Sequence, residues 1–298
     1  MRYARRATAV LARVGIRRAT ALTVAERSPA NGLAVNCPWY RADRRGENMT
    51  LKDFFEQVPK AAAAFSGGTD SAFVLWAAKK YGCDIHAYYV KTAFQPGFEL
   101  EDARRLAAEL DIPMTVVDMD ILSVYGAEEN GPERCYYCKR AIFTRLRDAA
   151  QADGYAVLLD GTNASDDAGD RPGMRALHEL QVRSPLRECG ITKAQVRERS
   201  KEAGLFTWDK PAYACLATRI PTGTRIRNRD LERVEQAEGA MYELGFRDFR
   251  VRLYKDGARI QVTGDQMQLA LEKRKQIHEK LGRLFSAVML DLEERSYG

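Results

Sequence analysis

The chain has 298 residues, is 45% hydrophobic and carries a formal net charge of +6, so it is long enough for two domains with cores of their own. Residues 1–48 hold ten arginines and three acidic residues, a net charge of +7, which leaves −1 for the rest of the chain. A remainder of −1 does not indicate a nucleic-acid surface, and no apolar run approaches the roughly 18 residues of a membrane span. We therefore expect neither a nucleic acid nor a membrane as partner.

Residues 1–48 are rich in Arg and Ala, a composition that resembles an organelle transit peptide. The segment 28–32 (SPANG) interrupts any helix there, and a helical pattern opens only at Leu51, just after Met49. We expect residues 1–48 to be a disordered leader, or to precede the true start of the protein at Met49.

The central motif, SGGTDS, lies between the apolar run 61–65 and a helical pattern that begins at Asp70. Adjacent glycines let the backbone approach a ligand, and the free N–H groups of a helix N-terminus favour phosphate. Asp70 fits beside phosphates only if a divalent cation such as Mg²⁺ bridges them. The residues of this motif predicted to bind nucleotide phosphates are Ser66, Gly67, Gly68, Thr69, Asp70 and Ser71.

The motif lacks the Gly-x-x-x-x-Gly-Lys-Ser/Thr pattern of the common mononucleotide-binding loop. It resembles instead the Ser-Gly-Gly-x-Asp-Ser signature of the PP-loop ATP pyrophosphatases. That resemblance implies an enzyme that cleaves ATP between the α and β phosphates, holds pyrophosphate in the loop and adenylylates a substrate. The alternative interpretation is a Gly-Gly turn that binds no ligand.

Strands and helices alternate after the motif. The predicted strands are 61–65, 84–91, 114–119 and 155–159, and the predicted helices are 72–81, 99–110 and one ending near residue 150. This order predicts a doubly wound parallel sheet with ligands at the carboxyl ends of its strands. The polar segment 160–167 follows the fourth strand, where it either faces adenosine, ribose or metal or is a plain loop. Its predicted ATP-binding residues are Gly161, Thr162 and Asn163.

The pattern changes near residue 224. Before it we expect a short strand at 183–186, a helix from Thr192 to Ala203 and an irregular stretch at 209–223. After it we expect a helix (229–244), strands (249–254 and 258–262), a helix (265–281) and a last strand (287–292). The pattern therefore predicts an α/β domain at 49–223 followed by a smaller α+β domain at 224–298. The resemblance implies that the first is a PP-loop (adenine nucleotide alpha hydrolase-like) domain and that the second binds substrate.

Six cysteines without a secretory signal argue against a disulfide framework and favour a reducing cytoplasm. Cys135 and Cys138 have the spacing of a ligand pair; a zinc pair, a redox pair and ordinary helix-start cysteines are the alternatives. Cys215 lies four residues before Arg219 and near Lys210, a setting that favours thiolate over thiol. The other two cysteines of the body, at positions 83 and 189, are expected to be buried fillers.

Several motifs together resemble the ATP-dependent sacrificial sulfur transferases of the LarE type. They are the loop, the CYYC of 135–138, the DGTN of 160–163, the RPG of 171–173 and the PAYACLATRIP of 211–221. The likeness covers residues 49–298. It implies adenylylation of a carboxylate of pyridinium-3,5-biscarboxylic acid mononucleotide, conversion to a thiocarboxylate, and a place in the synthesis of the nickel-pincer nucleotide cofactor of lactate racemase.

The resemblance also implies roles for particular residues. One branch of the family sacrifices a single cysteine, and another has three cysteines that hold a 4Fe–4S cluster; Cys135, Cys138 and Cys215 match the second branch. Cys215, Asp70 and Arg219 are the expected catalytic residues, with Asp70 also the Mg²⁺ ligand. Arg250, Arg252 and Glu238 are the expected substrate-binding residues. ATP, Mg²⁺ and the cluster are the expected cofactors, a sulfide donor the expected partner, and a homo-oligomer the expected state.

Three other functions are compatible with the loop. A PP-loop tRNA thiolase can also use three cysteines and an iron–sulfur cluster, but it needs a basic RNA surface. A PP-loop amidotransferase or ligase is disfavoured because no segment resembles a glutaminase domain. A non-enzymatic nucleotide-binding module would not exchange pyrophosphate with ATP.

Overall fold

The computed structural model describes residues 49–166 and 172–295; the predictions for residues 1–48 and for Arg171 lie outside these ranges. The α-helices are α1 (Leu51–Gln57), α2 (Thr69–Lys80), α3 (Gly97–Glu109), α4 (Arg134–Ala152), α5 (Pro172–Glu179), α6 (Pro185–Glu188), α7 (Lys193–Glu202), α8 (Asn228–Glu243), α9 (Met267–Glu272) and α10 (Arg274–Leu281). The strands are β1 (Lys60–Ala64), β2 (Asp84–Lys91), β3 (Met114–Asp118), β4 (Leu158–Leu159), β5 (Arg250–Tyr254), β6 (Gly257–Gln261) and β7 (Val288–Leu290). Three short 3-10 helices are η1 (Ile121–Ser123), η2 (Leu216–Arg219) and η3 (Gly264–Gln266). Within the described ranges, no helix is long and apolar enough to cross a membrane.

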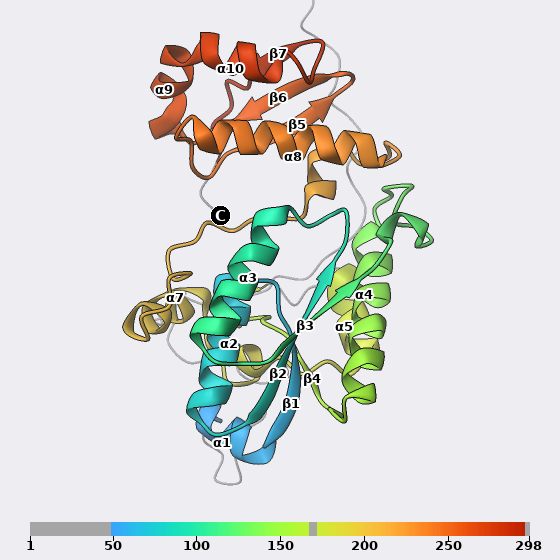
Figure 1. Ribbon diagram of the computed structural model, residues 1–298, viewed down its shortest axis with the longest axis vertical. Helices are drawn as coiled ribbons and strands as arrows, with labels where there is room; N and C mark the ends of the chain where they lie inside the picture. The colour runs from blue at the N-terminus through green and yellow to red at the C-terminus, as the bar shows by residue number, and fades with distance from the viewer. Residues whose placement is uncertain (1–48, 167–171, 296–298) are drawn as a thin grey trace, which may run out of the picture. The chain divides into compact units, whose positions relative to one another are not determined.

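The first sheet is parallel and has the order β3-β2-β1-β4. Successive residues of β2 belong to different cores: Tyr89 packs with α1, α2, α3 and α7, whereas Tyr88 and Val90 pack with α4 and α5. Figure 1 shows α2 and α3 on one side of the strands and α4 and α5 on the other. Since side chains alternate along a strand, a sheet buried on both faces needs apolar residues at nearly every position. The predicted doubly wound parallel sheet is confirmed.

The strand order reverses at β1, because the chain runs outward through β2 and β3 and then returns to place β4 on the other side of β1. In open α/β sheets, ligands bind in the crevice outside the carboxyl ends of the strands at such a switch point. The segments that follow β1 and β4 are the SGGTDS loop and residues 160–163. The topology thus brings two motifs together that are almost 100 residues apart.

The second sheet has the order β5-β6-β7, in which β5 and β6 are antiparallel and β6 and β7 are parallel. It is covered by α8, α9 and α10, and the predicted small C-terminal sheet is confirmed (Figure 1). Its core also takes Phe94, Ile121, Cys138 and Leu216 from the earlier part of the chain. The domain division at residue 223 stays a prediction, since this core draws on residues from both sides of it.

Two predicted elements are wrong. The strand expected at 183–186 is a single bridge between Leu159 and Arg183, and Pro185 then opens α6, because proline suits the first position of a helix. The helix expected at 265–281 is broken into η3, α9 and α10. Its break falls at Lys273, whose ammonium donates to the carbonyl oxygen of Leu244 at the end of α8 (2.6 Å).

Candidate functional site

The SGGTDS loop has a backbone that only glycine fits. Gly67 has a φ of 72°, and a Cβ there would lie 2.9 Å from the carbonyl oxygen of Glu99. Ser66 and Ser71 share a hydroxyl contact of 3.1 Å, and Gly68 is the N-cap residue of α2. The hydroxyl of Thr69 is buried and donates to the carbonyl oxygen of Thr207 (2.7 Å), so this side chain fastens the loop to the segment before Cys215.

The segment after β4 packs directly on this loop. A Cβ at Gly161 would lie 2.8 Å from the backbone nitrogen of Ser71, so the two motifs touch through backbone. Asp160 is buried and accepts hydrogen bonds from the hydroxyls of Ser184 (2.6 Å) and Thr162. Burial raises the pKa of Asp160, although these two donors act to lower it. Asp160 therefore stabilises the conformation of the segment after β4. Gly161 and Thr162 line the cavity described below.

Asp70 accepts hydrogen bonds from two distant residues. The Nζ of Lys193 lies 2.5 Å from its Oδ2, and the side-chain amide of Asn163 donates to its Oδ1 (3.4 Å). Asn163 therefore meets Asp70 as the two motifs imply. Within residues 49–166 and 172–295, no group of three His, Cys, Asp or Glu side chains is arranged to hold a single metal ion. A cation at Asp70 would thus have to share its coordination with phosphate oxygens and water, as Mg²⁺ commonly does.

A cavity of about 440 Å³ joins the loop to the cysteines. Ser66, Gly68 and Asp70 lie on its wall, and so do all three cysteines of the predicted cluster: Cys135, Cys138 and Cys215. Cys135 and Cys138 come from the first turns of α4, and Cys215 is the N-cap residue of η2. Aromatic and aliphatic side chains of β2 and α4 complete the lining (Tyr88, Tyr89, Val90, Ile142, Phe143 and Leu146).

The expectation that Cys215 is a thiolate is wrong for the free thiol. Burial raises the pKa of Cys215, and burial likewise raises the pKa of Cys138 to about 12. Arg219, the cation expected to favour the thiolate, is paired with Glu238 instead. Both Arg134 and Arg219 lower the pKa of Cys215, and Arg134 lowers it more than Arg219 does.

Three thiolates are a donor type that iron–sulfur clusters take, although no group of three cysteines within residues 49–166 and 172–295 is arranged to hold a metal ion. The three thiols line one cavity. A metal deprotonates the thiols that coordinate it, so a raised pKa of the free thiol does not oppose ligation. As predicted for fillers, Cys83 is buried and Cys189 packs against the core of the first sheet; neither lines this cavity.

Arg219 and Glu238 form a buried ion pair, with side chains only 1% and 3% exposed. The guanidinium donates to both carboxylate oxygens (2.8 and 3.1 Å), and Glu238 also accepts from the hydroxyl of Tyr213 and the backbone N–H of Val251. A further bond from Arg219 reaches the carbonyl oxygen of Ala214 (2.9 Å), beside Cys215. Glu238 thus connects α8, β5 and the segment that carries Cys215.

We expect Glu238→Gln to lower the free energy of unfolding by about 3–5 kcal/mol, because it leaves the buried Arg219 without a countercharge. Urea denaturation measures the change. Glu279→Gln is the matched control: its partner Arg283 is exposed, and a surface pair contributes at most about 1 kcal/mol. Equal losses in the two variants would contradict this role for Glu238.

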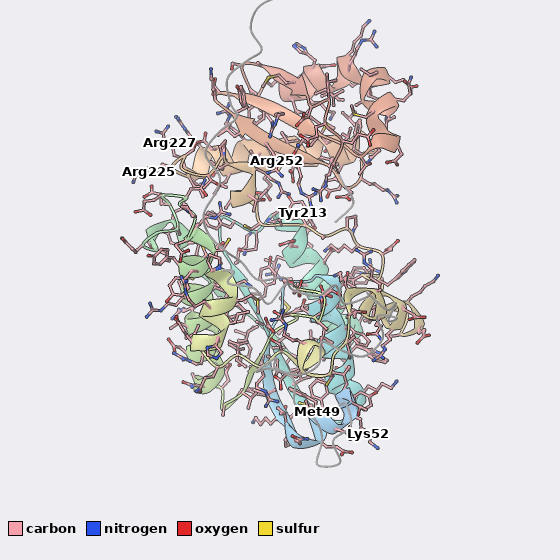
Figure 2. The ribbon with its side chains drawn as sticks, turned by 180° about the vertical axis from the view of Figure 1, so that it is seen from behind. Met49, Lys52, Tyr213, Arg225, Arg227 and Arg252 are labelled. Atoms are coloured by element: carbon pink, nitrogen blue, oxygen red, sulfur yellow. The ribbon has the colours of Figure 1, made fainter. Side chains whose placement is uncertain are left out.

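Arg250 and Arg252 lie on the same side of β5, as their spacing predicts. Arg250 is buried and donates to the carbonyl oxygen of Ala212 (2.5 Å), while Arg252 is half-buried and donates to that of Thr218 (2.7 Å). Figure 2 marks Arg252 and Tyr213, which belong to β5 and to the segment before η2. Burial lowers the pKa of both arginines, and Arg219 lowers it further. This local excess of positive charge suits an anionic group.

Sequence reasoning missed three residues at this site: Lys193, Arg134 and Glu99. Lys193 lies beside the loop, as does Lys210, which the sequence singled out only as a cation near Cys215, and Arg134 lines the cavity with the cysteines. Glu99 lines an adjoining cavity of about 320 Å³ with Cys215, and burial raises the pKa of Glu99 to about 7. Of the three missed residues, only Lys193 carried a sequence signal: a cation at the first position of a helix is unfavourable there.

Comparison with known proteins identifies relatives of this chain. A family model described as queuosine biosynthesis protein QueC matches residues 60–129. An uncharacterised protein of Synechocystis sp. is 36% identical over 254 residues, covering 82% of this chain and 92% of that protein. The tRNA-specific 2-thiouridylase MnmA of Pseudothermotoga lettingae is more distant, at 26% identity over 62% of this chain and 63% of its own length.

One relative carries a chemical name that matches the motifs of the sequence. The pyridinium-3,5-bisthiocarboxylic acid mononucleotide synthase of Lactiplantibacillus plantarum is 33% identical over 249 residues, covering 83% of this chain and 90% of that protein. The chain belongs to the family of this synthase, the LarE-type sulfur transferases of the PP-loop superfamily.

Proposed function

We propose that the protein is an ATP-dependent, AMP- and pyrophosphate-forming sulfur transferase. It converts a carboxylate of pyridinium-3,5-biscarboxylic acid mononucleotide to a thiocarboxylate, in the synthesis of the nickel-pincer nucleotide cofactor. The observation that supports this most is the shared cavity, whose wall carries both the SGGTDS loop and the three cysteines. A site that only bound nucleotide would have no use for three thiols beside the phosphates.

ATP is the activating reagent, because sulfide does not displace oxide from a carboxylate. A carboxylate oxygen of the substrate bonds to the α phosphorus while the bond from that phosphorus to the bridging oxygen breaks, and pyrophosphate leaves with the electron pair. The backbone N–H groups at the start of α2 are oriented to stabilise this charge. Asp70 is the proposed Mg²⁺ ligand, and Gly161, Thr162 and Asn163 complete the ATP site.

Cys135, Cys138 and Cys215 are the proposed ligands of a 4Fe–4S cluster. When bound by three thiolates, such a cluster has one iron open to sulfide from an external donor. Arg134 contributes a positive charge near the ligands, and Arg219 fixes the backbone around Cys215. Glu238 has its oxygens occupied by protein donors, so we propose that it positions Arg219 and the substrate arginines.

ATP–pyrophosphate exchange tests the proposed function. We expect exchange that depends on the pyridinium mononucleotide acid and on Mg²⁺. The similarity to MnmA over 62% of the chain favours a tRNA thiolase as second candidate. Exchange driven by unmodified tRNA and not by the mononucleotide would overturn the proposal in its favour.

The substrate's phosphate is proposed to bind at Arg252, with Arg250 behind it. We expect Arg252→Ala to weaken binding of the mononucleotide about tenfold or more, because a charged hydrogen bond is worth roughly 1.5–3 kcal/mol. Binding of ATP should not change, since Arg252 does not line the cavity at the loop. Calorimetry with each ligand measures both affinities.

Arg283→Ala is the control, because Arg283 is exposed on the same C-terminal part. Equal weakening of both ligands by Arg252→Ala, or no weakening of either, would remove Arg252 from the substrate site.

A further inference from the structure

Two lysines lie at a phosphate loop that has no cation of its own. The Nζ of Lys193 lies 2.5 Å from the Oδ2 of Asp70. The Nζ of Lys210 lies 3.3 Å from the carbonyl oxygen of Gly67 and 2.6 Å from the Oδ2 of Asp102. Both lysines line the cavity of about 320 Å³ that also contains Ser66 and Gly68. Two ammonium groups therefore reach the loop from residues more than 100 positions away.

The local structure of α7 does not explain why a lysine stands at position 193. Lys193 is the first residue of α7, next to the N-cap Thr192, and the first turn of this helix contains no acidic residue. A cation at this end of a helix opposes the dipole. Asp70, on a different helix, provides the countercharge for Lys193, whose side chain remains 32% exposed.

Lys210 is fixed in a different way. Asp102 on α3 pairs with it, and its ammonium lies 5.5 Å from the centre of the Phe98 ring. It belongs to the irregular segment that leads to Cys215, and it lines the same cavity as Ser66, Gly68 and Cys215. Only 19% of its side chain is exposed, which means that Lys210 is held in place before any ligand arrives.

We propose that Lys193 and Lys210 bind the pyrophosphate that leaves ATP and stabilise the charge that develops on it. This inference rests on the proposed function. It adds the residues that supply positive charge to the phosphates, a role that the lysine of the common mononucleotide-binding loop has. The bond that breaks joins the α phosphorus to the bridging oxygen, and the electron pair stays on the β phosphate. Two cations placed at that phosphate lower the energy of the departing group more than that of intact ATP.

Asp70 couples the lysine to the metal. The carboxylate of Asp70 pairs with Lys193. If Asp70 held Mg²⁺ beside the phosphates, the ammonium of Lys193 would be free to donate to a phosphate oxygen. The carboxylate alone cannot attract the phosphates, but Asp70, Mg²⁺ and the two lysines together can. Binding of pyrophosphate should therefore need both Mg²⁺ and Lys193.

The test measures binding of pyrophosphate and of AMP to the full chain by calorimetry with Mg²⁺ present. We expect Lys193→Gln and Lys210→Gln each to weaken pyrophosphate about tenfold or more and to leave AMP within twofold. Lys193→Arg should restore most of the affinity, because it restores the charge. A role confined to packing would move the melting temperature and not the ratio of the two affinities.

Lys201→Gln is the matched control, since Lys201 lies on the same helix with its ammonium 4.8 Å from the ring centre of Trp208. If the wild-type chain binds pyrophosphate and both glutamine variants bind it equally well, the lysine proposal is overturned and the proposed function stands. If the wild-type chain neither binds pyrophosphate nor cleaves ATP, both are overturned. Equal loss of AMP and pyrophosphate affinity would also overturn the lysine proposal.

Discussion

Asp70→Asn is expected to lower ATP cleavage at least about 100-fold while the protein stays folded. Asparagine keeps the shape of the side chain but cannot supply the carboxylate charge that Mg²⁺ needs beside the phosphates. A metal contributes several kcal/mol to transition-state stabilisation, and each 1.36 kcal/mol is tenfold in rate. Release of AMP and pyrophosphate with the mononucleotide and Mg²⁺ measures the loss.

Asp111→Asn provides the matched control for this variant. Asp111 also pairs with a lysine, Lys79 at 3.0 Å, but it is exposed and remote from both cavities at the loop. Its substitution should leave ATP cleavage unchanged. If Asp70→Asn released AMP at nearly the wild-type rate and melted at the wild-type temperature, Asp70 would not be the metal ligand.

Cys135→Ala is expected to remove both the iron and the turnover that added sulfide drives. Cys135 is exposed, so its loss should cost little folding free energy, and the effect is then attributable to the missing ligand. Anaerobic preparation followed by analysis of iron and acid-labile sulfide measures the first effect, and thiocarboxylate formed per chain measures the second. The wild-type chain should complete many cycles with an unchanged mass.

The competing hypothesis is sacrifice of Cys215, and mutation of Cys215 alone does not separate the two, because both require it. Under sacrifice, the intact mass falls by that of hydrogen sulfide, dehydroalanine appears at position 215, and turnover stops after one event per chain. Cys135 would then be dispensable. Cys83→Ala is the control for either outcome, since Cys83 lies away from the cavity and should change neither iron content nor turnover.

The sequence by itself was sufficient for most local patterns. Gly67 adopts the left-handed backbone that a Gly-Gly turn allows, and Thr192 caps α7 at the expected residue. The nearly continuous apolar strands were enough to indicate a parallel sheet buried on both faces. Because strand ends define the crevice in such a fold, the loop and residues 160–163 could be predicted to lie at one edge of the sheet, whereas the cysteine motifs were assigned by their resemblance to a family.

Only the tertiary structure decided the electrostatics of the site. Proximity in sequence suggested that Arg219 would favour a thiolate at Cys215, but Glu238, from another helix, binds that guanidinium, and burial raises the pKa of the thiol. Lys193 meets Asp70 across 123 positions and Lys210 meets Gly67 across 143. The pKa of a group depends on the charges near it in space and on its burial. Residue spacing in the sequence predicts neither the distance between groups on such distant segments nor how deeply each group is buried.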